Sequence, residues 1–311
     1  MISIPPTITV HTLTDAHCGV LTRFLAPRIA AAPYSSAMDE AAVRREVMAE
    51  PPPAVFPVRW QQHRRLGAWR AGQLVGFLDA AVGLDSESLD RPDYRPFGLI
   101  RFLALPDRPE LIADAAAALL NAAQRFWQET GIAYVKAFHL STGYPSFQAG
   151  AGLLPGDWGE QIRVLTGADF LLRERYYCFY RLLTDVHEEV TPLADLSLVY
   201  RGDRDDRRYE LYYRRIDWVG RARLVRSRVI SPQGKLPIAY LTDLYIDRPW
   251  RQQNIGKWLL RRLINDATLQ GDAQMVLHLA HHQHAAVNLF IQQGFQELSY
   301  RGYTLEKALT Q

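Results

Sequence analysis

The hydrophobic pattern changes period near residue 250. Residues 240–246 form an apolar run rich in strand-forming side chains, and Pro249 ends it. A polar stretch follows, after which apolar residues recur at every fourth position: Ile255, Leu259, Leu263 and Ala267. The pattern predicts a strand, a tight turn and a helix that ends near Gly271.

The first 185 residues carry a longer series of predicted elements. Their apolar periods predict a strand, two helices, a hairpin that turns at 70–72, a strand, a long helix, a strand, a short helix and closing strands. Pro27 is expected to end or kink the first helix, and Pro51-Pro52-Pro53 to end the second. Residues 83–96 are polar and are predicted to form a loop. The element ranges are 7–10, 17–26, 38–50, 64–82, 97–105, 113–128, 132–140, 156–167 and 171–183.

An acidic linker at 184–195 precedes a second series, which lacks counterparts of the two early helices. It contains strands, the helix described above and a short helix around Ala286. A chain of 311 residues with this pattern is expected to form two domains, 1–185 and 186–311, that repeat one architecture faintly. The predicted strands of the second domain are 196–200, 209–218, 221–230, 240–246, 276–279, 296–301 and 303–308.

The helix start at Ile255 has the chemistry of an anion site. A helix that begins after a strand presents backbone N–H groups without intrahelical acceptors, together with the positive end of the helix dipole. Gly256 adds little bulk there. The turn is therefore predicted to hold phosphate, with an ordinary helix start as the alternative.

The same turn resembles the acyl-CoA pyrophosphate loop of the GNAT acetyltransferase superfamily. The family pattern is Arg/Gln-x-x-Gly-x-Gly/Ala at the start of a long helix, and this chain reads Arg251-Gln252-Gln253-Asn254-Ile255-Gly256. Asn254 replaces the first glycine of the pattern. Asparagine is the non-glycine residue most tolerant of positive φ, so the turn is expected to survive the replacement.

Residues 276–295 resemble the second signature region of that superfamily, without a gap. A strand is followed by a helix that contains Ala286, and Gly294-Phe295 leads into the next strand. Two residues depart from the family pattern: Gln283 stands where Asn is usual, and Phe290 stands where the family has the Tyr that acts as general acid.

The resemblance implies an α/β (α+β) fold of two GNAT-like units, each a mixed, mostly antiparallel sheet flanked by helices with a central parallel strand pair. It implies acetyl-CoA as co-substrate and transfer of an acetyl group to an amine of a small molecule or peptide. The residues implied to contact the co-substrate are Leu244, Tyr245, Ile246, Arg251, Gln252, Gln253, Asn254, Ile255, Gly256, Lys257, Gln283 and Phe290.

Asp243 is the ionisable side chain of the central strand, beside the expected thioester. It can accept a proton from the acceptor amine, directly or through water, or it can be a structural carboxylate paired with a neighbouring arginine. Because Phe290 replaces the usual acid, another residue would have to protonate the leaving group. The candidates are Tyr300, Tyr303 and His281.

The first domain carries a degenerate form of the loop at 108–113. Leu111 replaces the glycine, Pro109 removes an N–H donor and Glu110 places a carboxylate where phosphates would bind. This domain is predicted to share the fold and to hold CoA poorly.

Composition bears on the charge of the ligand, on the compartment and on the protein classes that are excluded. The net charge of +3 is uneven: residues 1–185 carry 18 basic and 19 acidic side chains, and residues 186–311 carry 18 and 14. This mild bias suits a phosphate-rich ligand or a solvated surface. No nucleic-acid motif, membrane-length apolar run or signal-peptide pattern occurs, and the two cysteines, Cys18 and Cys178, indicate a reducing cytoplasm.

Four histidines near the second signature region do not have the spacing of a helix face or of a zinc signature, so no metal site is predicted. They are His278, His281, His282 and His284. A loop that lines the acceptor pocket is the favoured interpretation. Two functions fit the sequence: an N-acetyltransferase with one working site, or a non-catalytic acyl-CoA sensor or interaction module. A third hypothesis is a GNAT fold that has lost CoA altogether.

Overall fold

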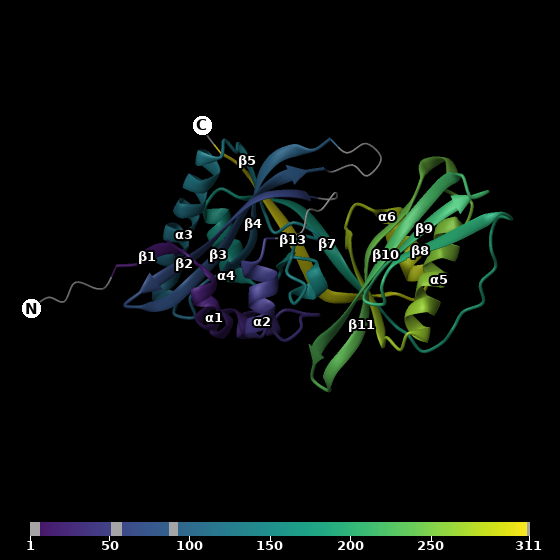
Figure 1. Ribbon diagram of the computed structural model, residues 1–311, viewed down its shortest axis with the longest axis horizontal. Helices are drawn as coiled ribbons and strands as arrows, with labels where there is room; N and C mark the ends of the chain where they lie inside the picture. The colour runs from purple at the N-terminus through teal and green to yellow at the C-terminus, as the bar shows by residue number, and fades with distance from the viewer. Residues whose placement is uncertain (1–6, 51–57, 87–92, 310–311) are drawn as a thin grey trace, which may run out of the picture. The chain divides into compact units, whose positions relative to one another are not determined.

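The structure is a computed structural model that describes residues 7–50, 58–86 and 93–309. The chain forms two compact units (Figure 1): unit 1 comprises Met1–Arg175 and Gly302–Gln311, and unit 2 comprises Tyr176–Arg301. The predicted helix stop at 51–53, residues 87–92 of the predicted loop and the N-terminal residues 1–6 lie outside the described residues.

Unit 1 contains its elements in the predicted order. Its helices are α1 (Cys18–Ala30), α2 (Glu40–Ala42), α3 (Pro109–Glu129) and α4 (Gly159–Gly167), with a π-helical segment at Val43–Met48 and 3-10 turns at Asp15–His17 and Gln148–Gly150. Its strands are β1 (Thr9–Thr12), β2 (Val58–Arg70), β3 (Gln73–Asp85), β4 (Arg95–Ala104), β5 (Tyr134–Ala137) and β6 (Leu154–Pro155), with parts of β7 (Leu171–Leu182) and β13 (Gln296–Ala308).

The sheet of unit 1 runs β1-β2-β3-β4-β5, and only β4 and β5 are parallel neighbours. Ala71 and Gly72 turn the β2–β3 hairpin with φ angles of 48° and 77°, the left-handed pair that a tight hairpin requires. Helix α3 covers one face, where Gly76 leaves room for Leu119. The π-helical segment lies on the other face, where Arg65 Nε donates to the Val47 carbonyl at 2.9 Å.

Several elements of unit 1 differ in extent from the predictions. The β2–β3 hairpin spans residues 58–85, so residues 83–85 of the predicted loop belong to a strand. Helix α1 continues through Pro27 to Ala30, because a proline in the last turn removes only one hydrogen bond. The strand predicted at 132–140 is shorter, since Phe138, directly after β5, has a φ of 59° that ends the extended backbone.

Unit 2 has fewer helices. They are α5 (Ile255–Leu269), α6 (His284–Gln292) and a 3-10 turn at Arg248–Trp250. Both α5 and α6 contribute to the buried cluster on one side of the sheet. None of the described helices is long and apolar enough to cross a membrane. The strands are β8 (Leu196–Gly202), β9 (Asp206–Tyr213), β10 (Asp217–Ser231), β11 (Gly234–Ile246) and β12 (Gln274–Ala280), with the remaining parts of β7 and β13.

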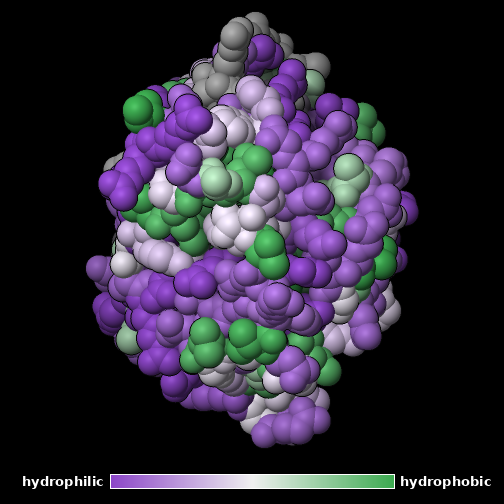
Figure 2. Space-filling view, turned by 90° about the vertical axis from the view of Figure 1, so that its right-hand side faces the viewer, coloured by the Kyte–Doolittle hydropathy of each residue, from purple (hydrophilic) through white to green (hydrophobic). Residues whose placement is uncertain are grey.

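The sheet of unit 2 runs β7-β12-β11-β10-β9-β8, and again only one neighbouring pair, β11 and β12, is parallel. This arrangement confirms the predicted fold class. The predicted apolar stripe of α5 is buried, and Gly271 follows the helix with a φ of 82°. Exposed large apolar side chains of this unit are scattered, and the face of the molecule in Figure 2 is mostly hydrophilic with small separate hydrophobic patches.

Strands β7 and β13 each belong to both units. β7 begins in unit 1, and its residues 176–182 pair with the whole of β12. β13 begins in unit 2, and its residues 305–308 pair with β5. The compact units therefore differ from the predicted division after residue 185. The strands predicted at 296–301 and 303–308 are one strand, because Gly302 does not break it but allows close packing on Leu153.

Candidate functional site

The parallel strands of unit 2 separate after a short stretch. β11 and β12 are in register only from Ile238 with Gln274 to Tyr240 with Val276. β11 then continues to Ile246 beside β10, while β12 continues to Ala280 beside β7. The divergence forms a fork, and on its inner edges lie main-chain groups that no neighbouring strand pairs among the residues the structure describes.

A β-bulge accompanies the fork. The register between β10 and β11 shifts at Arg223 and Leu224, which face Asp243 and Leu241 and leave Thr242 as the extra residue. A bulge bends its strand and increases the local twist. Unit 1 has a corresponding shift between β3 and β4, with Arg101 as the extra residue.

The direction of the main-chain groups on β11 follows from one hydrogen bond. The Asp247 N–H donates to the Val219 carbonyl at 2.9 Å. These two residues lie opposite each other in the register that also pairs Tyr245 with Arg221. Antiparallel partners alternate between bonded and non-bonded pairs, so the amides of Tyr245 and Asp243 face β10. The main-chain groups of Leu244 and Ile246 therefore point into the fork.

The turn after β11 supplies a second set of main-chain donors. Gln252 and Asn254 have φ angles of 63° and 60°, and Asn254 is the N-cap of α5. The first helical bond is donated by Trp258 to the Asn254 carbonyl at 3.0 Å. Among the described residues, none of the N–H groups from Gln252 to Lys257 donates to a backbone carbonyl, so they remain available for an anion.

The side chains around this turn leave it open. Residues 251–254 are exposed, and a Cβ on Gly256 would have only ordinary contacts, 3.6 Å from Ile246 and 3.9 Å from Leu289. The glycine is therefore not required by the fold itself, and the space beside it is free for close approach. Arg251 Nε donates to the Ile246 carbonyl at 2.8 Å, so it occupies one acceptor at the mouth of the fork.

The two departures from the family pattern lie in different environments. Gln283 is the exposed N-cap residue of α6 and makes no capping hydrogen bond with its side chain. Phe290 is 3% exposed and packs edge-on against Phe295, with ring centroids 5.2 Å apart. Phe290 is therefore a core residue of unit 2. Of the alternative acids, Tyr300 and His281 belong to unit 2, whereas Tyr303 belongs to unit 1.

Asp243 lies on the side of the sheet away from α5. Arg221 Nε donates to its carboxylate at 2.6 Å, and the Asp243 side chain is 26% exposed. Burial raises the pKa of Asp243, and the charge of Arg221 opposes this shift. The carboxylate is thus paired with an arginine, as the structural alternative predicted, and is at the same time a stronger base than a free aspartate.

A buried tyrosine–histidine pair lies where β11 and β12 begin to separate. The Tyr240 hydroxyl and His278 Nδ1 are 3.1 Å apart, on the same face of the sheet as Asp243. The imidazole also meets the Tyr300 ring edge-on at 5.9 Å. Burial lowers the pKa of His278 to about 3, so the ring is neutral near pH 7. Sequence reasoning grouped His278 with three other histidines and missed this pair, although His278 is the only polar residue of 275–280.

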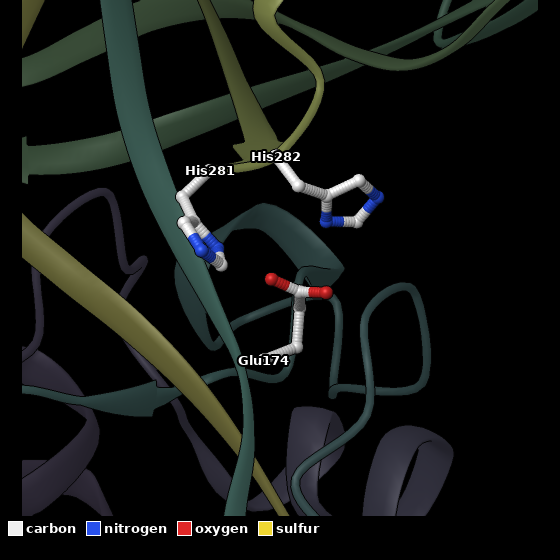
Figure 3. A group of neighbouring side chains, drawn as sticks. All are labelled: Glu174, His281 and His282. Carbon is white, nitrogen blue, oxygen red and sulfur yellow. The ribbon is translucent and has the colours of Figure 1, made fainter.

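Three side chains in the described part of the chain could offer ligand atoms to a cation: Glu174, His281 and His282, whose ligand atoms all lie within 4.8 Å of one another (Figure 3). The sequence had indicated no acidic residue near these histidines. Both histidines are exposed, and Glu174 belongs to unit 1 while they belong to unit 2.

The corresponding corner of unit 1 is built differently. Arg28 donates to the Leu105 carbonyl just after β4 and pairs with Asp107 at 2.7 Å. None of the described residues between β4 and α3 has positive φ. A cavity of about 200 Å³ remains here; Trp158, Glu160 and Ile112 are part of its lining. The turn of unit 2, with its free amides from Gln252 to Lys257, therefore has no equivalent in the described part of unit 1.

Comparison with known proteins agrees with this geometry. Residues 176–295 match the model of the acetyltransferase (GNAT) family. A tandem GNAT protein from the clavulanic acid biosynthesis pathway superposes with a TM-score of 0.64 at 14% identity, over 97% of this chain and 98% of its own. The protein is a tandem GNAT-fold chain. The family match begins at the first residue of unit 2 and ends within that unit, so unit 2 is the part of this chain that is similar to the family.

Two further structures share the fold of the tandem GNAT chain. A GCN5-related N-acetyltransferase from Sphaerobacter thermophilus aligns over 98% of this chain and 97% of its own, with a TM-score of 0.61 and 10% identity. A glucosamine N-acetyltransferase region of a fungal multi-domain β-N-acetylglucosaminidase aligns over 98% of this chain and 38% of its own, with a TM-score of 0.68 and 11% identity. No curated protein matches the sequence. At these identities the likeness establishes the fold and leaves the substrate open.

Proposed function

We propose that unit 2 binds acetyl-CoA and transfers its acetyl group to an amine of a small molecule or peptide. One observation carries this proposal: a fork with unpaired main-chain groups leads directly into a turn whose amides from Gln252 to Lys257 have no backbone acceptor. The first feature suits the amides of a pantetheine chain, and the second suits a diphosphate.

The contacts follow from the placement of these groups. The main-chain groups of Leu244 and Ile246, with Tyr245 between them, would hold the pantetheine. The amides of the turn would hold the diphosphate, and Arg251 and Lys257 would add positive charge. Arg251 would exchange its hydrogen bond to Ile246 for the ligand. Each of these charges is worth about 0.3–1 kcal/mol.

The chemistry requires one proton acceptor. The amine nitrogen attacks the thioester carbonyl, the new C–N bond forms, the C–S bond breaks and the thiolate of CoA leaves. Asp243 takes the proton that the amine loses, because its raised pKa makes its carboxylate a stronger base than that of an ordinary aspartate. General base catalysis of this kind contributes a factor of about 10²–10⁴.

A non-catalytic acyl-CoA sensor is the second candidate. It is favoured by Phe290, which fills the position of the usual tyrosine acid and is buried in the core. Turnover separates the two functions. Release of CoA thiol with any member of an amine panel supports the enzyme, whereas tight binding of acetyl-CoA with no release on a broad panel supports the sensor.

Calorimetric titration of acetyl-CoA tests the binding site. Gly256→Glu places a carboxylate among the free amides, where it repels the diphosphate, and we expect affinity to fall by about 100-fold, or ~2.7 kcal/mol. The matched control is Gly159→Glu at the first residue of α4, where a side chain meets open space. Equal affinities of both variants and the wild type would exclude the turn as the binding site.

A further inference from the structure

The Tyr240–His278 pair leaves one polar atom of the fork without a partner. Among the described residues, His278 Nε2 is fully buried and has no hydrogen-bond partner. Such an atom is costly to leave unsatisfied, and a buried polar group of this kind usually has a partner when the protein is in its working state.

The position of the pair ties this atom to the fork. Tyr240 is the last residue of β11 in register with β12, and His278 lies two residues beyond the last paired residue of β12. Successive odd or even residues of a strand share one face, so both side chains lie on the face away from α5. Their hydrogen bond therefore spans the point where the strands begin to separate.

The contact between the Tyr240 hydroxyl and His278 Nδ1 fits a tautomer with the proton on Nε2. Burial keeps the Tyr240 hydroxyl protonated, so it can donate to Nδ1, and we assign this direction to the hydrogen bond. A neutral imidazole that accepts at Nδ1 carries its hydrogen on Nε2. The unpartnered atom is thus an N–H donor. Cys178, directly opposite His278 on β7, is also held neutral by burial.

We infer that His278 is a catalytic residue whose Nε2–H hydrogen-bonds the acyl carbonyl oxygen of the bound thioester. This inference rests on the proposed acyl-CoA site of unit 2. When the amine attacks, negative charge develops on that oxygen, and a fixed neutral donor stabilises it without giving up its proton. Tyr240 is the positioning residue that holds the imidazole in the donating tautomer.

Infrared spectroscopy of acetyl-CoA labelled with ¹³C at the carbonyl tests this contact without requiring turnover. In the wild type the bound carbonyl stretch should lie at lower frequency than in water. In His278→Leu, a variant of similar bulk without a donor, the shift should be lost while calorimetric affinity changes by less than about threefold. In the acetyl-transfer assay, kcat should fall by about 10²–10³.

Two further variants keep the test specific. Tyr240→Phe should reduce both the shift and kcat by a smaller factor, because the imidazole can then adopt either tautomer. Tyr180→Phe, which removes a tyrosine hydroxyl that binds Gln296 instead, should change neither. A carbonyl shift and kcat unchanged in His278→Leu would overturn the inference while the proposed function stands.

The failure of the proposed function has a different signature. A wild type that binds acetyl-CoA without turnover contradicts acetyl transfer, yet the infrared shift still decides the contact with His278. A wild type that does not bind acetyl-CoA contradicts both proposals, and calorimetry shows this directly. Thermal melting of each variant identifies a general loss of folding.

Discussion

At the scale of single residues, the ion pairs of this protein differ in whether they lie beside the fork. Asp243 and Asp206 each accept hydrogen bonds from an arginine of β10, but only Asp243 lies beside the fork. Lys136 and Asp85 form a buried pair in unit 1, far along the chain from the turn at 251–257. From the sequence, Asp243 is expected to be either a catalytic base or a structural carboxylate paired with an arginine. The structure shows the arginine partner, Arg221, and the role as a base stays a prediction.

The pH dependence of acetyl transfer tests Asp243. Because its pKa is raised, we expect kcat/KM to fall as pH decreases through a value above the usual 3.8 of aspartate. Asp243→Asn should lower kcat by about 10²–10⁴ and remove that limb of the profile. Asp272→Asn breaks another arginine pair, with Arg226 at 2.7 Å, that does not act on Asp243, and it should leave the profile unchanged. An active Asp243→Asn enzyme with the wild-type profile would assign the proton transfer elsewhere.

Asp85 makes unit 1 sensitive to acid. Burial by itself raises its pKa, but the hydrogen bond from His139 and the charges of His139 and Lys136 together lower it to about 2. A depressed folded-state pKa gives stability that is complete above the unfolded pKa near 3.8 and is lost as pH falls towards 2. The loss should reach about 2 kcal/mol.

Urea unfolding between pH 5 and pH 2 measures this loss. Asp85→Asn should be less stable at pH 7, because the buried Lys136 then loses its nearer carboxylate and keeps only Glu306 at 3.9 Å, and its stability should change less with pH over the acid range. An unchanged acid dependence in the variant would show that other carboxylates dominate.

At the scale of elements, the turn before α5 shows how backbone conformation leaves main-chain amides without backbone acceptors in the described part of the chain. Gln252 and Asn254 hold left-handed φ angles, which direct successive amides of the turn outwards. The family glycine is replaced by the residue that best tolerates this geometry. Unit 1 has a helix in the same position, but Pro109 starts it and Arg28 fills the approach. A helix that follows a strand is therefore not enough by itself to form a binding site.

Substitution of Asn254 tests whether acetyl-CoA binding needs the left-handed backbone conformation at this position or the asparagine side chain. Asn254→Gly should keep both stability and acetyl-CoA affinity, since glycine adopts this φ freely. Asn254→Val should cost about 1–2 kcal/mol of stability and weaken acetyl-CoA binding. The control Asp195→Val, at another left-handed position with φ of 65°, should lose similar stability in urea unfolding but keep its affinity. Equal weakening by both valine variants would mean that affinity follows stability alone.

At the scale of the whole molecule, the two units are joined through shared strands. Residues 176–182 provide the only antiparallel neighbour of β12 in the described chain, and Leu305 of the C-terminal segment is buried in the core of unit 1. A division of the chain at the acidic linker would therefore remove an essential strand from unit 2 and leave a strand of unit 1 attached to it.

Two fragments of 126 residues each test this division. The fragment 176–301 keeps the whole of unit 2, and we expect it to fold and to bind acetyl-CoA in calorimetry. The fragment 186–311, which follows the boundary predicted from sequence, lacks the partner of β12 and should show no cooperative unfolding transition. Cooperative unfolding of 186–311 alone would favour the sequence-based boundary.

The sequence by itself determined the order of elements and the turn at 251–257, because these depend on local periodicity and on backbone preferences of nearby residues. The tandem fold class came from the resemblance of its motifs to a known superfamily. The boundary of the units, the pairing of Tyr240 with His278 and the burial of Phe290 depended on contacts between residues far apart in the chain. Such contacts are decided by strand register and packing, which a pattern along one chain does not encode. Only the tertiary structure could show which polar atoms stay unpaired at the fork.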